Sequence, residues 1–233
     1  MISKVALLKF LISVIFFLGG CRKSEQEKII AKAPPYQPVN LYPRERLPTY
    51  FNRVAVMPAF CDNSSATALS FIDDLILQEL SKSRLFEPTR VTPLESFELF
   101  GKERLSSYES LPEDFFDQLV NKYGANGVLL IDIHSYRPYR PISIGVRAKL
   151  VDLKSGEFMW AIDETVDGGD ASVIVSAINF QKSKHVQALS DKTMGSILQS
   201  PRLFSKFLTN SIFSTLPNRW KLSICKNIET GTS

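Results

Sequence analysis

The 233-residue sequence has few of the residues that most often carry out catalysis or bind metals. It contains two histidines, His134 and His185, and three cysteines, none of which is spaced as in a zinc site. It has no G-x-S-x-G nucleophile elbow, and the DGGD segment at 167–170 lacks the lysine and the spacing of a phosphate-binding loop. The sequence therefore predicts no cofactor, no metal, no catalytic residues and no enzymatic activity.

The first strongly apolar run, 10–18, is too short to cross a bilayer, which takes about 20 apolar residues. It follows Lys4 and Lys9 and is succeeded by two glycines. A basic start, a short apolar core and small residues in this order are typical of a secretory signal peptide. We therefore expect residues 1–20 to be a signal peptide that is removed.

The residues Leu18-Gly19-Gly20-Cys21 resemble the bacterial lipobox, whose cysteine is acylated on sulfur and begins the mature protein. The resemblance implies that Cys21 is lipidated and anchors the chain to a membrane, since each buried methylene contributes about 0.8 kcal/mol. The alternative is an ordinary signal peptide that is cut nearby. Arg22 stands where some enteric lipoproteins have an aspartate, and this resemblance implies the outer membrane, on its periplasmic face.

The mature chain carries little net charge. Of the 28 basic residues, Lys4 and Lys9 lie in the signal peptide, which leaves 26 against 24 acidic residues. A net charge near +2 gives no broad positive field, so nucleic acid is not an expected partner. In an oxidising compartment Cys61 and Cys225 could pair, or both could stay free.

Composition divides the mature chain into a tether and one globular domain. Five prolines and many charges, without apolar periodicity, lie between Arg22 and Tyr50, so residues 21–51 are expected to be the lipid anchor and a proline-rich tether. Residues 52–225 should form one α/β domain, and residues 226–233 a disordered tail.

Periodicity within 52–225 predicts a single mixed β-sheet with an antiparallel hairpin and helices packed on it. Strands are expected at 53–60, 86–91, 127–133, 143–150 and 157–164, and 221–225 is a candidate terminal strand. Helices are expected at 66–83, 93–101, 110–124, 170–184 and 200–217, several of them opened by a capping residue. The resulting order is β-α-β-α-α-β-β-β-α-α, with the strand at 86–91 near an edge because Pro88 cannot donate to a ladder.

Two segments carry a resemblance to a known family: LVNKYGANGVLLIDI at 119–133 and VRAKLVDLKSGEFMWAID at 146–163. With the pattern that begins at Arg53, they resemble a superfamily of bacterial envelope lipoproteins. That superfamily includes the curli secretion channel and the outer-membrane activators of penicillin-binding proteins, and its fold is related to the amino-terminal domain of the Tol translocation protein. Members with known roles are channels or binding partners, so the resemblance implies no catalytic residues.

The segment YRPYRP at 136–141 is the most distinctive polar stretch. Tyrosine and arginine side chains contribute strongly at protein interfaces, so Tyr136, Arg137, Tyr139 and Arg140 form the candidate partner surface. The alternative is a connection between strands whose arginines keep a sheet edge soluble.

Two pairs of residues are candidates for acid–base or metal chemistry. Asp132 and His134 share one face of the predicted strand and could pair, although a structural or exposed pair is the alternative. Asp73 and Asp74 are neighbours on a helix and point about 100° apart, so they are expected on a solvated face.

Together these features predict a membrane-anchored, non-enzymatic envelope lipoprotein that binds another envelope protein, and they leave homo-oligomerisation open. One alternative is a subunit of an oligomeric secretion pore, for which 172–180 is the nearest candidate spanning segment, although its pattern favours a helix. The other is an envelope enzyme or small-ligand binder around Asp132, His134 and Arg137.

Overall fold

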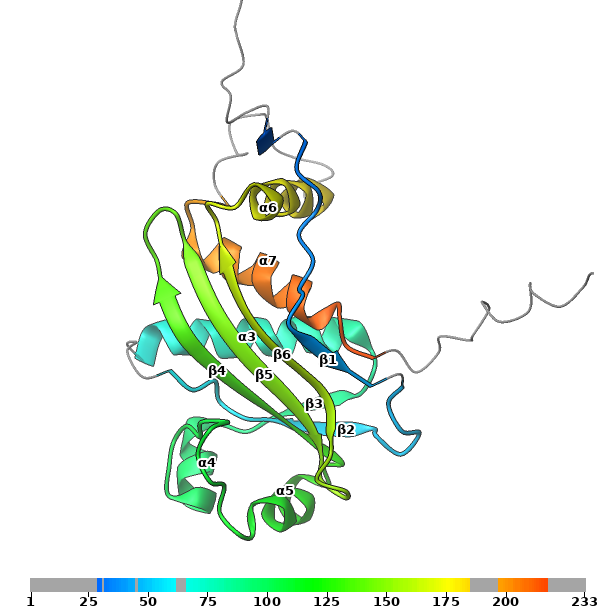
Figure 1. Ribbon diagram of the computed structural model, residues 1–233. Coiled ribbons are helices and arrows are strands. Elements are labelled where there is room, and N and C mark those ends of the chain that lie inside the picture. The colour runs from blue at the N-terminus through cyan, green and yellow to red at the C-terminus, as the bar shows by residue number, and fades with distance from the viewer. Residues whose placement is uncertain (1–28, 31, 45, 62–65, 185–196, 218–233) are drawn as a thin grey trace, which may run out of the picture.

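The structure is a computed structural model that describes residues 29–30, 32–44, 46–61, 66–184 and 197–217 (Figure 1). Its strands are β1 (Leu41–Pro43), β2 (Arg53–Val56), β3 (Glu87–Arg90), β4 (Gly127–Arg137), β5 (Ser143–Asp152) and β6 (Phe158–Asp167). Its helices are α3 (Ala66–Ser83), α4 (Pro93–Phe100), α5 (Phe115–Tyr123), α6 (Ala171–Lys184) and α7 (Pro201–Phe213).

The six strands form one sheet in the order β1-β6-β5-β4-β2-β3. β2 pairs in parallel with β3 and β4, whereas β4–β5, β5–β6 and β6–β1 are antiparallel. The prediction of a single mixed sheet with an antiparallel hairpin is confirmed, and so is the edge position of β3. The predicted order of elements is also correct, except that β1 precedes it.

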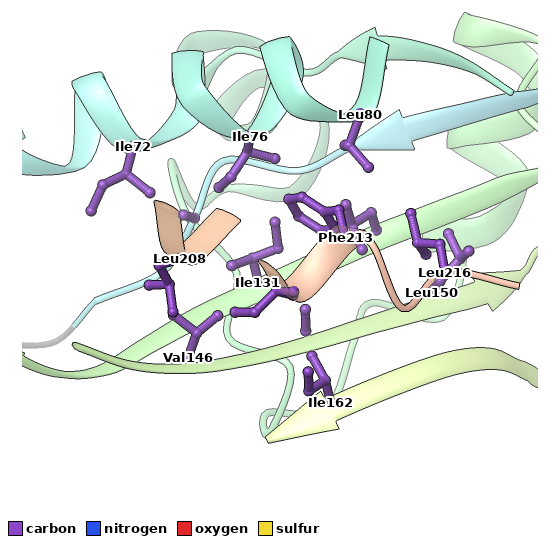
Figure 2. Close-up of a cluster of buried hydrophobic side chains, with 14 of the residues drawn as sticks. Ile72, Ile76, Leu80, Ile131, Val146, Leu150, Ile162, Leu208, Phe213 and Leu216 are labelled. Carbon is purple, nitrogen blue, oxygen red and sulfur yellow. The ribbon is translucent and has the colours of Figure 1, made fainter. Parts of the chain in front are cut away.

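Helices cover the sheet on both faces, at different places along the strands (Figure 1). On one face α3 and α7 lie across the strands, and Ile72, Ile76 and Leu80 of α3 point toward sheet residues such as Ile131 and Val146 (Figure 2). The 3.6-residue period of α3 predicted this inward stripe. On the other face α4 and α5 cover a smaller core near the start of β4.

Local sequence signals fix several helix ends. Thr92 caps α4 through a reciprocal capping box with Glu95, and Gly124 ends α5 in the left-handed conformation, both as predicted. The predicted start of α5 at Ser110 is wrong. A turn closed by the Phe115 N–H and the Pro112 carbonyl replaces the first helical turn, and the helix begins at Phe115.

The structure corrects the predicted boundary between tether and domain. Leu41–Pro43 pair with β6, and Leu47 and Phe51 are buried at 5% and 0% exposure. The phenyl ring of Phe51 lies where a Cβ on Gly127 would be, which fixes it against the first residue of β4. The domain therefore begins well before residue 52, and only the part of the expected tether before Tyr36 has no packing role among the described contacts.

Other predictions concern residues outside the described ranges. These are the signal peptide at 1–20, the lipidation site Cys21, the candidate strand at 221–225 with Cys225, and the tail at 226–233. The helical interpretation of 172–180 is confirmed, because this segment lies within α6.

The burial of Leu47 can be tested by truncation. Leu47→Ala is expected to lower the free energy of unfolding by about 2–5 kcal/mol, because it removes buried methyl groups and leaves a cavity. Val39→Ala, at a side chain 86% exposed, is the control and should change little. Urea denaturation measures the free energy of unfolding of both variants. If both lose equally little, Leu47 belongs to the tether and not to the core.

Candidate functional site

The candidate partner surface lies at the turn between β4 and β5, which we call the hairpin tip (Pro138–Pro141). Tyr139 is 79% exposed and Arg140 is also exposed. Tyr136 instead packs partly against the main core, and burial raises its pKa above the usual value. The structure therefore exposes three of the four predicted side chains, namely Arg137, Tyr139 and Arg140.

Arg137 braces the hairpin tip. Its Nε donates to the Pro141 carbonyl at 2.8 Å, and its Nη2 pairs with Asp167 Oδ2 at 2.7 Å. One guanidinium thus ties the two ends of the turn to the end of β6. Arg137 supports this conformation, and its charge is already paired.

A second loop supports the same turn from the side. The Gly168 N–H donates to the Ile142 carbonyl at 2.7 Å, and a Cβ at Gly168 would come within 3.0 Å of that oxygen. Asp167 Oδ1 accepts the Gly169 N–H at 2.8 Å. The DGGD segment therefore connects β6 to α6 and packs against the hairpin tip.

Asp132 has a structural partner. The carboxylate is 2% exposed and accepts hydrogen bonds from the Ser107 N–H at 2.9 Å and from the Ser107 hydroxyl. Lys149 Nζ donates to the Ser107 carbonyl at 2.7 Å. These bonds fix the loop between α4 and α5 on the sheet.

His134 reaches a different partner. A bulge in β4 between Ile133 and Ser135 changes the register there, and the imidazole lies over Gly145, where a Cβ would come within 2.2 Å of its Cε1. Its Nε2 is 3.3 Å from Asp163 Oδ1. The interpretation of Asp132 and His134 as an acid–base pair is therefore wrong, because each side chain has its own partner.

The Asp163 carboxylate contacts both His134 and Arg147, and Arg147 stacks on the ring of Tyr108. Arg147 donates to Asp163 Oδ2 through Nε and Nη2, and its guanidinium carbon lies 3.8 Å from the centre of the Tyr108 ring. This arrangement neutralises the carboxylate that His134 approaches. With Arg137 held by Asp167 at the hairpin tip, the three residues of the enzyme hypothesis, Asp132, His134 and Arg137, bind three different partners.

A second carboxylate, that of Asp73, is buried although the sequence pattern did not indicate it. Asp73, expected on a solvated face, is 7% exposed and accepts the Ala59 N–H at 2.9 Å. Arg104 bridges Asp73 Oδ2 at 3.1 Å and the Ala59 carbonyl at 2.6 Å. Burial raises the pKa of Asp73, and the Ala59 N–H and Arg104 act in the opposite direction. Asp74 is exposed, as predicted, and pairs with Arg90.

Two hollows are the main candidates for ligand sites. The cavity between α3, α7 and the sheet has a volume of about 20 Å³ and is lined almost entirely by aliphatic side chains. It has room for about one water molecule. An open groove of about 720 Å³ runs between residues 36–44 and the end of α7.

Within the described ranges, no group of three or more His, Cys, Asp or Glu side chains could hold a metal ion. No helix in those ranges has both the length and the hydropathy that a bilayer span requires.

Comparison with known proteins finds matches among solved structures. No protein-family model matches the chain, and no curated protein is similar to it in sequence. The PelC dodecamer from Paraburkholderia phytofirmans is similar at 14% identity and a TM-score of 0.44, over 77% of this chain and 96% of that one. Lipoprotein GNA1162 from Neisseria meningitidis is similar at 16% identity and a TM-score of 0.41, over 57% and 99%.

The C-terminal domain of LpoB from Salmonella enterica is similar at 17% identity and a TM-score of 0.34, over 50% of this chain and 82% of that domain. At such identities and TM-scores the likeness concerns the course of the chain and says nothing about function.

The different roles of Asp132 and His134 give a test. Asp132→Ala should lower the free energy of unfolding by about 3 kcal/mol, since hydrogen bonds to a charged group contribute about 1.5–3 kcal/mol each. His134→Ala removes a partly exposed polar contact with Asp163 and should cost less than about 1 kcal/mol. Urea denaturation of both variants measures this, and the opposite ranking would contradict the structural role of Asp132.

Proposed function

We propose that this chain is a lipid-anchored, non-enzymatic envelope protein that binds another envelope protein through its hairpin tip. The observation that carries the proposal is the 79% exposure of Tyr139 on a turn braced by Arg137 and by the loop at 167–170. Arg140 stands beside it, exposed.

A braced turn favours binding for an energetic reason. Ordering a mobile loop on association costs free energy, and a turn that is already ordered avoids much of that cost. A tyrosine adds a large, stiff apolar surface with a polar end, and an arginine adds five donors in a fixed plane. Side chains of these two kinds often contribute most at desolvated interfaces.

The membrane part of the proposal rests on the sequence. Cys21 would carry the acyl chains, and the chain after it would hold the domain on the periplasmic face of the outer membrane. The order of basic residues, apolar core and Gly19-Gly20-Cys21 supports this, and Arg22 supports the outer membrane.

Lipidation is tested by intact mass. Protein extracted from membranes should begin at Cys21 and carry the added mass of acyl chains, and Cys21→Ser should remain in the signal-bearing form or leave the membrane fraction. An unmodified mature protein that starts at another residue would refute the anchor.

Partner binding is tested by placing a photocrosslinking amino acid at Tyr139 in the cell envelope. We expect a discrete adduct that contains an envelope protein, and Arg140→Ala should reduce its yield roughly tenfold, the loss typical of an interface arginine. The same probe at Tyr108, also an exposed tyrosine, and the change Arg90→Ala are the matched controls.

Equal adducts from Tyr108 and Tyr139, or an adduct unaffected by Arg140→Ala in folded protein, would overturn the hairpin tip as the binding surface. An adduct made only of two copies of this chain would replace the proposed partner by self-association.

A further inference from the structure

The segment Tyr36–Pro43, which we call the strap, lies across the domain but is only lightly packed. No residue from Tyr36 to Arg44 is fully buried, and only Tyr36 and Leu41 among the strap residues pack partly against the main core, whereas Leu47 and Phe51 lie in it. Segments with few buried apolar contacts open locally at much lower free energy than a core does. The fully buried attachment of the chain to the domain therefore begins at Leu47.

Backbone groups hold the strap in place. Glu164 of β6 is 8% exposed, and its Oε1 accepts the N–H groups of Val39 and of Asn40, the latter at 2.7 Å. The Tyr36 N–H donates to Ser176 Oγ of α6 at 2.7 Å. The three residues of β1 add a short ladder with β6. One carboxylate is thus the main charged contact of the strap.

The strap is attached along one side. On its other side lies the open groove of about 720 Å³, whose far wall is the end of α7, from Asn210 to Pro217. The ring of Tyr36 also contacts the ring of Phe207 in α7, at 6.5 Å between ring centres. Figure 1 shows the strap running between α6 and the edge of the sheet, beside α7.

Release of the strap would remove the partial cover that Tyr36 and Leu41 give to the main core, but it would leave the contacts of Trp160 with the end of α7 in place. Trp160, the β6 residue opposite Pro43, is held from the other side by Thr215, whose hydroxyl accepts its indole N–H at 3.0 Å, and by the ring of Phe213. Glu164 would pass into water, where its charge is well solvated. The domain can therefore stay folded with the strap detached.

We propose that the strap is a reversible latch that sets how far the domain can stand from its membrane, an inference that rests on the proposed anchor at Cys21. With the strap docked, the segment from Arg22 to Pro35 reaches at most roughly 43 Å at about 3.1 Å per residue. With the strap released, the free segment extends to Pro43 and reaches roughly 68 Å at about 3.1 Å per residue. Docking thus shortens by about a third the range over which the hairpin tip can meet a partner.

Hydrogen exchange measured by mass spectrometry on the full protein extracted from membranes tests the latch. Peptides that cover the strap should exchange at least about 100-fold faster than those of β4 and β5, because they open locally. Glu164→Gln should speed strap exchange roughly tenfold and leave β4 and β5 unchanged, since it removes the charge from the main contact. Glu87→Gln, at an exposed acid on the far edge of the sheet, is the matched control.

Strap exchange at the same rate as β4 and β5 would show that the strap opens only with global unfolding, and would overturn the latch. The same conclusion would follow if Glu164→Gln and Glu87→Gln had the same effect.

Reach is measured separately with a locked strap. Tyr42 and Ala161 are opposite each other in the ladder, so Tyr42→Cys with Ala161→Cys can form a cross-strand disulfide, with Cys61 and Cys225 replaced by serine. On a supported bilayer, neutron reflectometry should place the oxidised protein closer to the membrane than the reduced protein. Equal distances would overturn the control of reach. Protein that does not attach to the bilayer would refute the anchor at Cys21, and the exchange result would stand independently.

Discussion

Burial of β4 on both faces is the constraint on which the rest of the structure depends. All seven residues from Gly127 to Ile133 are buried. Leu129, Ile131 and Ile133 belong to the core under α3 and α7, whereas Val128 and Leu130 belong to the core under α4 and α5. A strand buried on both faces joins two cores that would otherwise be separate. Water is excluded from β4 only when the helices on both faces of the sheet are in place.

Signals that act over a few residues could be predicted from the sequence, and contacts between distant polar groups could not. The capping box at Thr92, the end of α5 at Gly124 and the inward stripe of α3 each depend on neighbours within one or two turns. Asp73 depends on Arg104, 31 residues away, and the strap depends on Glu164, which receives backbone N–H groups. Backbone donors leave no signature in the residue types of the strap.

The candidate site shows the same division. Its residue types indicated the segment at 136–141 as a candidate interface. The sequence could not indicate which of its side chains have no contacts within the domain. Arg137 is used to brace the turn, and Tyr136 is partly used by the core. The bulge beside His134 shifts the register of β4 by one residue, and an alternating pattern has no means of indicating such a shift. The hypothesis that Asp132 and His134 could pair assumes an unbroken alternation of side chains along β4.

The pairing of the strap with β6 has a consequence for the order of folding. β4, β5 and β6 follow one another as a meander, so their contacts close short loops, whereas the contact of Val39 with Glu164 spans 125 residues. Contacts of such long separation form late, because their loop-closure entropy must be offset by structure that already exists. The strap is therefore among the last segments to dock, after the part of the sheet that receives it has formed.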